Sequence, residues 1–370
     1  MTSPKTKEYP FYFQTTTVLL GLVLVVFICS VLTDLLVPLA FAAFLSILLN
    51  PLCNRLQKWG VSQILAIILT LTIAVIFVSA LFYFLSTQIA QFTESLPMLK
   101  SKFDSMSHDL QQWIEHKFGI ATKKQTGMIQ DALNNSQAMV GKTVGTLLGT
   151  LSIIFLLPVY MFLMLYYKTL ILNFIFEIFK EENSKNVAEI LTETKGAIQS
   201  YIVGLLIEML IVAAMNSVAL LLLGVKYAVL IGCIGAILNL IPYLGGIVAI
   251  LLPVLMATVT KDGFTTQLGV IGAYAVIQFI DNNILVPRIV SSKVQINALI
   301  SIIVVLLGNQ LWGVSGMFLS IPIIAVLKII FDRIDDLKPW GKLLGDTVPT
   351  HVKRWGRKPS VSEKIVEGKS

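Results

Sequence analysis

The 34-residue stretch from Tyr227 to Thr260 reads YAVLIGCIGAILNLIPYLGGIVAILLPVLMATVT and contains no charged side chain. At 1.5 Å per residue, a continuous helix of this length would reach about 51 Å, whereas the hydrocarbon core of a bilayer is about 30 Å thick. The stretch is therefore apolar enough for a membrane and too long to cross it once as a straight helix. Pro242 and the pair Gly245 and Gly246 lie near its middle and predict a break there.

Other parts of the chain have the same character. Of the 370 residues, 13% are charged and 56% are hydrophobic, whereas an average soluble domain has about 25% charged residues. An ordinary soluble globule is therefore excluded. The long uncharged runs cover residues 9–33, 35–54, 59–93, 143–167, 227–260, 263–280 and 294–327. Because none of them alternates like a membrane barrel strand, we predict an all-α polytopic membrane protein with about eight transmembrane helices.

The transmembrane bundle is predicted over residues 1–330. Its spans are expected near residues 14–32, 35–52, 62–88, 143–167, 197–223, 227–258, 264–286 and 298–330. The last run also contains helix breakers, so two of the spans are predicted to be broken or kinked, and a re-entrant hairpin remains the alternative for both. Apolar residues at helical spacing predict amphipathic helices in an outer segment, 89–142, and in an inner segment, 168–195. Residues 331–370 are predicted to form a basic cytoplasmic tail.

The distribution of Lys and Arg predicts the orientation of the bundle. Basic residues in short connections stay on the cytoplasmic side, and Arg55, Lys58 and the cluster between Lys353 and Lys358 flank predicted spans. Both termini are therefore expected in the cytoplasm, with residues 89–142 outside. In this eight-span arrangement Arg288 and Lys293 fall on the outer side, which counts against this orientation, although the rule tolerates a minority of exceptions.

Several other classes of protein lack support in the sequence. The net charge is +7, but the basic residues form no patch interleaved with exposed aromatic residues, so we do not predict nucleic-acid binding. Cys29, Cys53 and Cys233 are scattered, which predicts no disulfide and no metal site. The motifs HExxH, GxSxG and GxxxxGK[ST] do not occur, so we predict neither an enzyme nor a cofactor.

Glu208 lies in the middle of a predicted span, where an ionisable group costs at least about 2.5–3.5 kcal/mol to insert. A carboxyl group in a low-dielectric site can load and release a proton near physiological pH, so one interpretation is a proton or cation ligand. The alternative is a neutral Glu208 that hydrogen-bonds to Asn216 or another polar group inside the bundle.

Asp281 belongs to the polar cluster QFIDNNILVPR, residues 278–288, which follows an apolar run. Its carboxylate, together with amide oxygens, could coordinate a hard cation such as Na⁺, and Pro287 would free backbone carbonyls. The alternatives are that Asp281 and its neighbours cap a helix, or that Arg288 neutralises Asp281.

Three motifs in this order resemble the autoinducer-2 exporter family of bacterial membrane proteins. They are NLIPYLGG at residues 239–246, DNNILVPR at 281–288 and LGNQLWGVSGMFLSIP at 307–322. The resemblance extends over all the predicted spans. It implies an eight-span bundle in the bacterial inner membrane and a homo-oligomer. The family's activities are export of small molecules, including the quorum-sensing signal, and Na⁺/H⁺ antiport in some members.

We therefore expect a membrane transporter that exports a small solute, a signalling molecule among the candidates, with coupling to a cation gradient. The alternatives are a Na⁺/H⁺ antiporter and, in a different class, a structural or signalling protein that acts through residues 89–142. The expected partners are the lipid bilayer, the solute or cation, and further copies of the chain. The candidate residues of the pathway are Glu208, Asn216, Asn239, Pro242, Gly245, Gln278, Asp281, Asn283, Pro287, Arg288, Gly313, Gly316 and Pro322.

Overall fold

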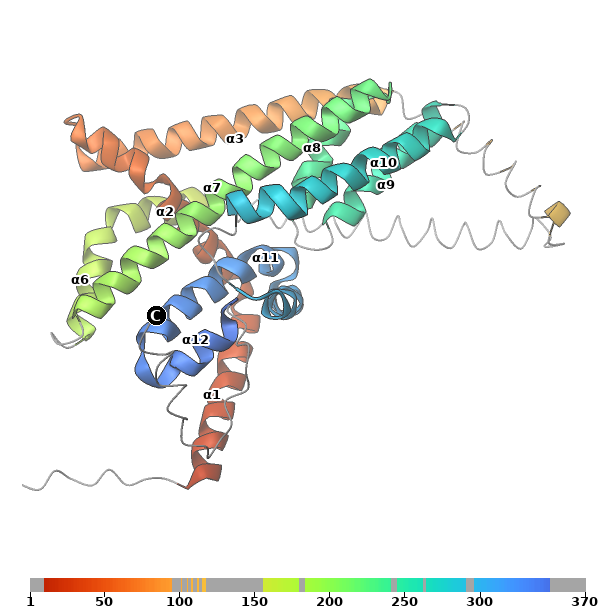
Figure 1. Cartoon of the computed structure of the whole chain (residues 1–370). Coiled ribbons are helices and arrows are strands. Elements are labelled where there is room, and N and C mark those ends of the chain that lie inside the picture. Colours follow the sequence, from red (N-terminus) through yellow and green to blue (C-terminus); the bar gives the residue numbers. More distant parts are fainter. Residues whose placement is uncertain are drawn as a thin grey trace, which may run out of the picture.

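The structure is a computed structural model of the chain (Figure 1). It describes residues 10–94, 156–179, 184–240, 245–261, 264–290 and 296–346, with isolated positions between 101 and 117. Within these ranges all regular structure is helical, which confirms the predicted fold class. Pro242, most of the outer segment 89–142 and the tail beyond residue 346 lie outside the described residues.

The elements follow each other in this order: α1 (Phe11–Val31), α2 (Thr33–Lys58), α3 (Gln63–Glu94), α6 (Lys168–Ile178), α7 (Ser184–Leu222), α8 (Ala228–Asn239), α9 (Gly245–Thr260), α10 (Thr265–Ile280), the π-helix η2 (Asp281–Val290), α11 (Ala298–Arg333), the 3-10 helix η4 (Asp335–Leu337) and α12 (Lys338–Leu344). A helix over Leu156–Tyr166 precedes α6, and the chain bends by 61° between the two helices. Among the described residues, five helices are long and apolar enough to cross a membrane, or six if this bent pair is one span. The predicted number of eight spans is not confirmed.

Helix α7 is the centre of the bundle. It contacts α2, α8, α10, η2 and α11 (Figure 1). Its 39 residues correspond to about 58 Å, nearly twice the hydrocarbon thickness. The helix therefore includes both a predicted span and the end of the predicted inner segment 168–195. Helices α1 and α3 expose large apolar side chains along most of their length, as expected for surfaces that face lipid.

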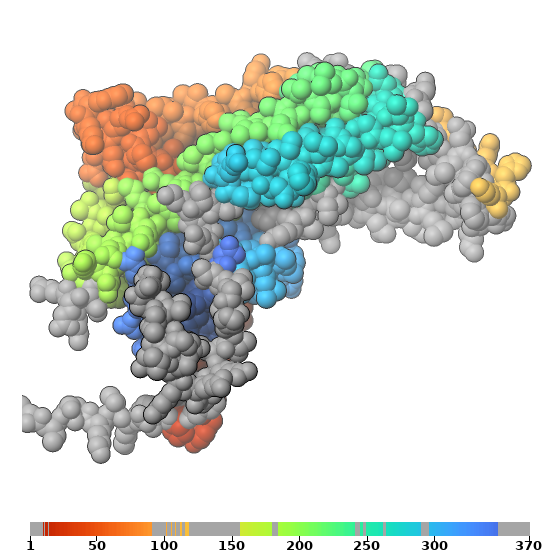
Figure 2. All heavy atoms as spheres, viewed as in Figure 1, coloured from red at the N-terminus to blue at the C-terminus, as the bar shows by residue number. Residues whose placement is uncertain are grey.

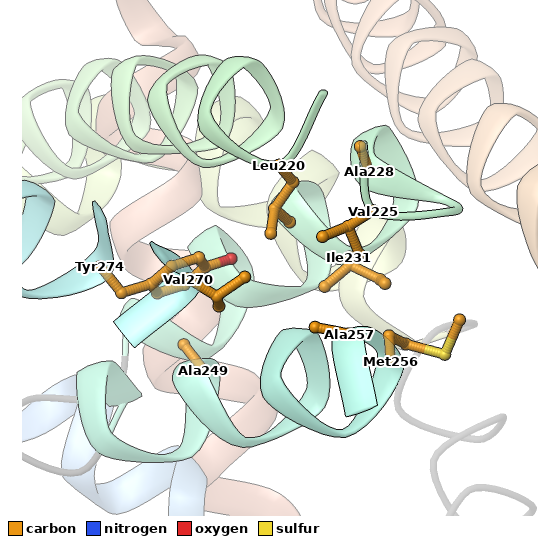
Figure 3. Packing of buried hydrophobic residues seen from close by; sticks show 9 residues of the cluster. All are labelled: Leu220, Val225, Ala228, Ile231, Ala249, Met256, Ala257, Val270 and Tyr274. Carbon is orange, nitrogen blue, oxygen red and sulfur yellow. The ribbon is translucent and has the colours of Figure 1, made fainter. Parts of the chain in front are cut away.

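The 34-residue uncharged stretch 227–260 folds back on itself. Helix α8 and helix α9 pack against each other. Ala228 at the start of the run and Val225 just before it share a buried cluster with Met256 and Ala257 at its end (Figure 3). A straight or kinked span would place these ends on opposite sides of the membrane. The run is therefore a helical hairpin, which decides between the two alternatives left open by the sequence.

The hairpin reverses the predicted direction of the next span. Helix α10 begins beside the end of α7, because Val270 of α10 shares a buried cluster with Leu220 of α7 and Gly269 lies against Leu223. It runs towards the opposite end of α7, where Val286 and Ile289 of η2 pack on the cluster that contains Ile198 and Ile202. Arg288 therefore lies towards the same end of the bundle as Arg55 and Lys58. The expectation that Arg288 faces the other side assumed that run 227–260 crosses the membrane. With the run folded back, we predict instead that Arg288 lies on the same side of the membrane as Arg55 and Lys58.

Helix α11 is a second hairpin. Trp312 and Gly313 leave the helical conformation, and Gly313 has φ = 60° and ψ = −141°, a backbone geometry suited to glycine. Beyond this break Ser320 Oγ donates to the carbonyl of Val304 at 2.9 Å. In a straight helix residues 16 apart would be about 24 Å apart. The two arms therefore lie against each other, and Gly308 and Gly316 are in backbone contact.

Both ends of α11 are tied to one end of the bundle. The N-cap residue Asn297 bonds to the carbonyls of Leu343 and Gly345, which close the segment after α11. Arg333 at the end of α11 forms ion pairs with Glu189 and Glu193 near the start of α7. The two hairpins thus enter the bundle from opposite ends.

Candidate functional site

A buried polar pocket lies where three breaks in helical structure meet beside α7. The first break is the end of α8 at Asn239, the second is the start of α9 at Gly245, and the third is the change from α10 to η2 at Asp281. Broken helices at membrane depth are tolerated where protein or a water-filled cavity surrounds them, and in several transporter folds they form the binding site.

Local sequence explains these breaks. Gly245 lies against the backbone of Leu238 and Asn239, since an added Cβ would be 2.6 Å from Asn239 Cα, so the return of the hairpin requires glycine there. Gly246 lies against Gln278 of α10, since an added Cβ would be 2.7 Å from Gln278 Cδ. The absence of a side chain at Gly246 therefore lets the hairpin pack closely against α10. The wider π-helix of η2 contains Pro287, which lacks a backbone donor. Such π segments are rare and frequent at functional sites.

Two carboxyl groups from separate helices meet in this region. Asn239 Nδ2 donates to Asp281 Oδ2 at 2.8 Å. The Asp281 carboxyl group also lies within hydrogen-bonding reach of the Glu208 carboxyl group. Both side chains are buried, with 5% of Glu208 and 2% of Asp281 exposed.

No described Lys, Arg or His forms an ion pair with Glu208 or Asp281. Arg288 in particular is exposed and does not neutralise Asp281, so that alternative is not supported. Two buried carboxylates in contact, without a counter-charge, cannot both remain ionised at reasonable cost. The pair must therefore hold a proton between its oxygens or a bound cation beside them.

The pocket next to this pair is small, with a volume of about 10 Å³, which is room for about one water molecule. Its polar lining residues are Asn216, Asn239, Tyr274, Gln278 and Asp281, and its apolar wall comes from Val212, Gly235, Ala249 and Ile277. Four buried oxygens in this region have no hydrogen-bond partner among the described residues: Glu208 Oε2, Asn216 Oδ1, Tyr274 Oη and Asp281 Oδ1.

Carboxylate, amide and hydroxyl oxygens of this kind are the ligands that hard cations prefer. No group of three or more His, Cys, Asp and Glu suited to a metal ion occurs in the described ranges. The geometry therefore favours an oxygen-coordinated monovalent cation or a water molecule over a transition metal.

The structure brings together only part of the predicted set. Glu208, Asn216, Asn239, Gly245, Gln278 and Asp281 line the pocket or adjoin it. Asn283 points elsewhere, because its Nδ2 donates to the carbonyl of Phe279 at 2.8 Å, and Pro287 and Arg288 are exposed. Gly313, Gly316 and Pro322 shape the α11 hairpin and are not among the residues that line this pocket.

Tyr274 was not predicted as a site residue. Its ring belongs to the buried cluster between α7, α8, α9 and α10, while its hydroxyl group faces the pocket without a partner (Figure 3). An aromatic residue in an apolar run normally indicates core packing. The only available signal was the polar hydroxyl group, four residues before Gln278 and therefore on the same helix face.

The fold and the site define a polytopic α-helical membrane protein with two re-entrant hairpins and a buried carboxyl pair. The model of the AI-2E family transporters matches residues 17–336, so the chain belongs to this family and is a membrane transporter.

Individual relatives agree with this family. The chain is 25% identical over 335 residues to the AI-2 transport protein TqsA of Escherichia coli strain K12, covering 89% of this chain and 95% of the relative. It is 24% identical over 314 residues to the "Putative transport protein YrrI" of Bacillus subtilis strain 168, covering 81% of this chain and 86% of the relative. The residues matched by the family model, 17–336, include both hairpins and the residues of the site.

Proposed function

We propose that this transporter exports a small polar solute and couples the export to a cation gradient through the pair Glu208 and Asp281. The observation that carries the proposal is the buried carboxyl pair without a counter-charge, next to a pocket with unpartnered oxygens. The solute class follows the name of the relative TqsA, an AI-2 transport protein. The protein would act in the bacterial inner membrane with both termini in the cytoplasm.

The coupling follows from charge balance. When the pocket is empty, a proton on the carboxyl pair avoids the cost of a buried charge. When a cation such as Na⁺ enters, the oxygens of Asp281, Asn216 and Tyr274 are free to coordinate it, and the proton can leave. Cation and proton therefore compete for one site, and their exchange can be linked to movement of the α8–α9 hairpin that forms part of it.

Na⁺/H⁺ antiport without an organic solute is the second candidate. The small pocket supports it, because a volume of about 10 Å³ is room for about one water molecule or one ion, whereas sites for organic ligands are usually about 300–1,000 Å³. A cation fits this pocket, whereas a sugar-sized solute requires a more open conformation.

The test uses the purified full-length protein in liposomes that contain a pH-sensitive dye. An imposed Na⁺ gradient should drive proton movement that protein-free liposomes lack, and a transported solute should increase it. Proton movement that responds to no member of a panel of small polar solutes, AI-2 included, would replace coupled export by antiport. Absence of any Na⁺-driven proton movement and of solute uptake would overturn both candidates.

A further inference from the structure

A second pocket lies at the other side of α7, away from the carboxyl pair. It is open, has a volume of about 300 Å³ and is lined by Pro51, Asn54, Arg55, Lys58 and Lys195. The first four residues belong to the last two turns of α2, and Lys195 belongs to α7. In Figure 2 the end of α2, in orange, lies at the same edge of the molecule as the yellow-green chain of α6 and α7. Three cationic side chains from two helices thus converge on one cavity.

These positive charges have no counter-charge in the described part of the chain. None of Arg55, Lys58 and Lys195 forms an ion pair there. The nearby acidic residues of α7, Glu189 and Glu193, are held by Arg333. The pocket is therefore an unneutralised positive site, which favours a bound anion.

A fourth cation adjoins the pocket. Lys168 Nζ donates to Asn50 Oδ1 at 3.1 Å, and Asn50 directly precedes Pro51 of the pocket wall. Basic residues in the last turn of α2 also complement its helix dipole, which is sufficient to explain Arg55 and Lys58. The dipole of α2 does not explain Lys168 or Lys195, which come from other helices.

The position of the pocket identifies the source of the anion. The uncharged run of α2 ends at Asn54, so Arg55 and Lys58 lie where the hydrocarbon gives way to headgroups. Trp59 follows with 73% of its surface exposed, as is typical of aromatic residues at a membrane interface. Exposed Ile64 and Leu65 at the start of α3 continue an apolar surface next to it, which suits acyl chains.

We propose that Arg55, Lys58 and Lys195 bind the phosphate headgroup of an anionic phospholipid. Basic pockets between helices at the cytoplasmic face are known to hold lipid phosphates, and the charge distribution predicts that this end is cytoplasmic. The site is separate from the carboxyl pair, so this proposal is independent of the mechanism of transport.

Native mass spectrometry of the full-length protein in detergent tests the proposal, with phosphatidylglycerol and phosphatidylcholine of the same acyl chains as probes. We expect the wild type to retain phosphatidylglycerol preferentially. Lys58→Gln and Lys195→Gln should each weaken this retention about fivefold, the effect of one basic residue near anionic lipid. The matched control is Lys185→Gln, which should behave as wild type. Lys185 is an exposed lysine near the start of α7 and does not line the pocket.

Three outcomes would overturn the proposal. Equal retention of the two lipids by the wild type, or unchanged retention in Lys195→Gln, would show that the pocket does not select anionic lipid. Displacement of phosphatidylglycerol by millimolar inorganic phosphate would assign the pocket to a soluble anion instead. Both single variants change exposed side chains and should fold, which gel filtration checks in parallel.

Discussion

The contact between the two arms of α11 makes a quantitative prediction for Gly316→Ala. A Cβ atom at Gly316 would lie 2.6 Å from the carbonyl carbon of Gly308, whereas ordinary contacts begin at 3.4 Å. The carbonyl oxygen of Gly308 would lie nearer still. Because both atoms are backbone and cannot rotate away, the arms must separate by at least about 0.8 Å. A gap of that size removes about a quarter to a half of each dispersion contact along the interface.

We therefore expect Gly316→Ala to lower the free energy of unfolding by about 1–3 kcal/mol relative to Gly272→Ala, the range for overpacking. Gly272 lies in α10 and has no atom within 4 Å of an added Cβ, so it is the matched control. Both variants gain a similar helix propensity, about 1 kcal/mol, which cancels in the comparison.

The assay is equilibrium unfolding of both purified variants in detergent, followed by tryptophan fluorescence. In a straight α11 the two glycines would be about 12 Å apart, and alanine at position 316 would meet no backbone from position 308. Equal stability of Gly316→Ala and Gly272→Ala would therefore refute the hairpin of α11.

Three further predictions concern the two hairpins. In a cysteine-free background, the pair Val304→Cys and Ser320→Cys should be joined by a short bifunctional thiol reagent, because Ser320 Oγ bonds to the Val304 carbonyl; failure to cross-link would indicate a straight helix. Arg288→Cys and Lys195→Cys should be labelled by an impermeant reagent from the same side of the membrane, and labelling from opposite sides would restore the eight-span order. Gly246→Ala should displace Gln278 and reduce transport while the free energy of unfolding changes by less than about 1 kcal/mol, because the neighbour is a flexible side chain; unchanged transport would remove Gln278 from the site.

The breaks of the long runs were predictable, but their geometry was not. Pro242, Gly245 and Gly313 interrupt apolar runs that exceed the bilayer, and this arithmetic requires a break. The same residues permit a kink or a full reversal. Packing decides between them, as with Gly308 and Gly316, whose small size lets two backbones meet. The signal for a reversal in the sequence was the presence of two glycines, Gly308 and Gly316, at similar distances on either side of the break at Gly313.

The members of the site could be identified individually, but not as a cluster. Glu208 and Asp281 stood out because a charge in an apolar run is expensive. Their contact depends on how α10 and η2 pack on α7, which no local pattern encodes. The alternative in which Arg288 neutralises Asp281 is not supported, because Arg288 lies on the surface of the π-helix.

The central claim is that the carboxyl pair exchanges a proton for a cation. Its most direct test is Na⁺-driven proton movement in proteoliposomes as a function of pH, with Glu208→Gln compared with Glu189→Gln. Gln keeps the shape of Glu and its capacity for hydrogen bonds but cannot titrate. Glu189 lies on the same helix but is paired with Arg333 outside the pocket, so its variant controls for loss of a carboxylate.

We predict that Glu208→Gln folds and shows only the proton movement of protein-free liposomes, while Glu189→Gln retains the rate and pH dependence of the wild type. A Glu208→Gln protein with the rate and pH dependence of the wild type would contradict the claim. Glu208 would then be a buried hydrogen-bond partner of Asp281 that takes no part in coupling.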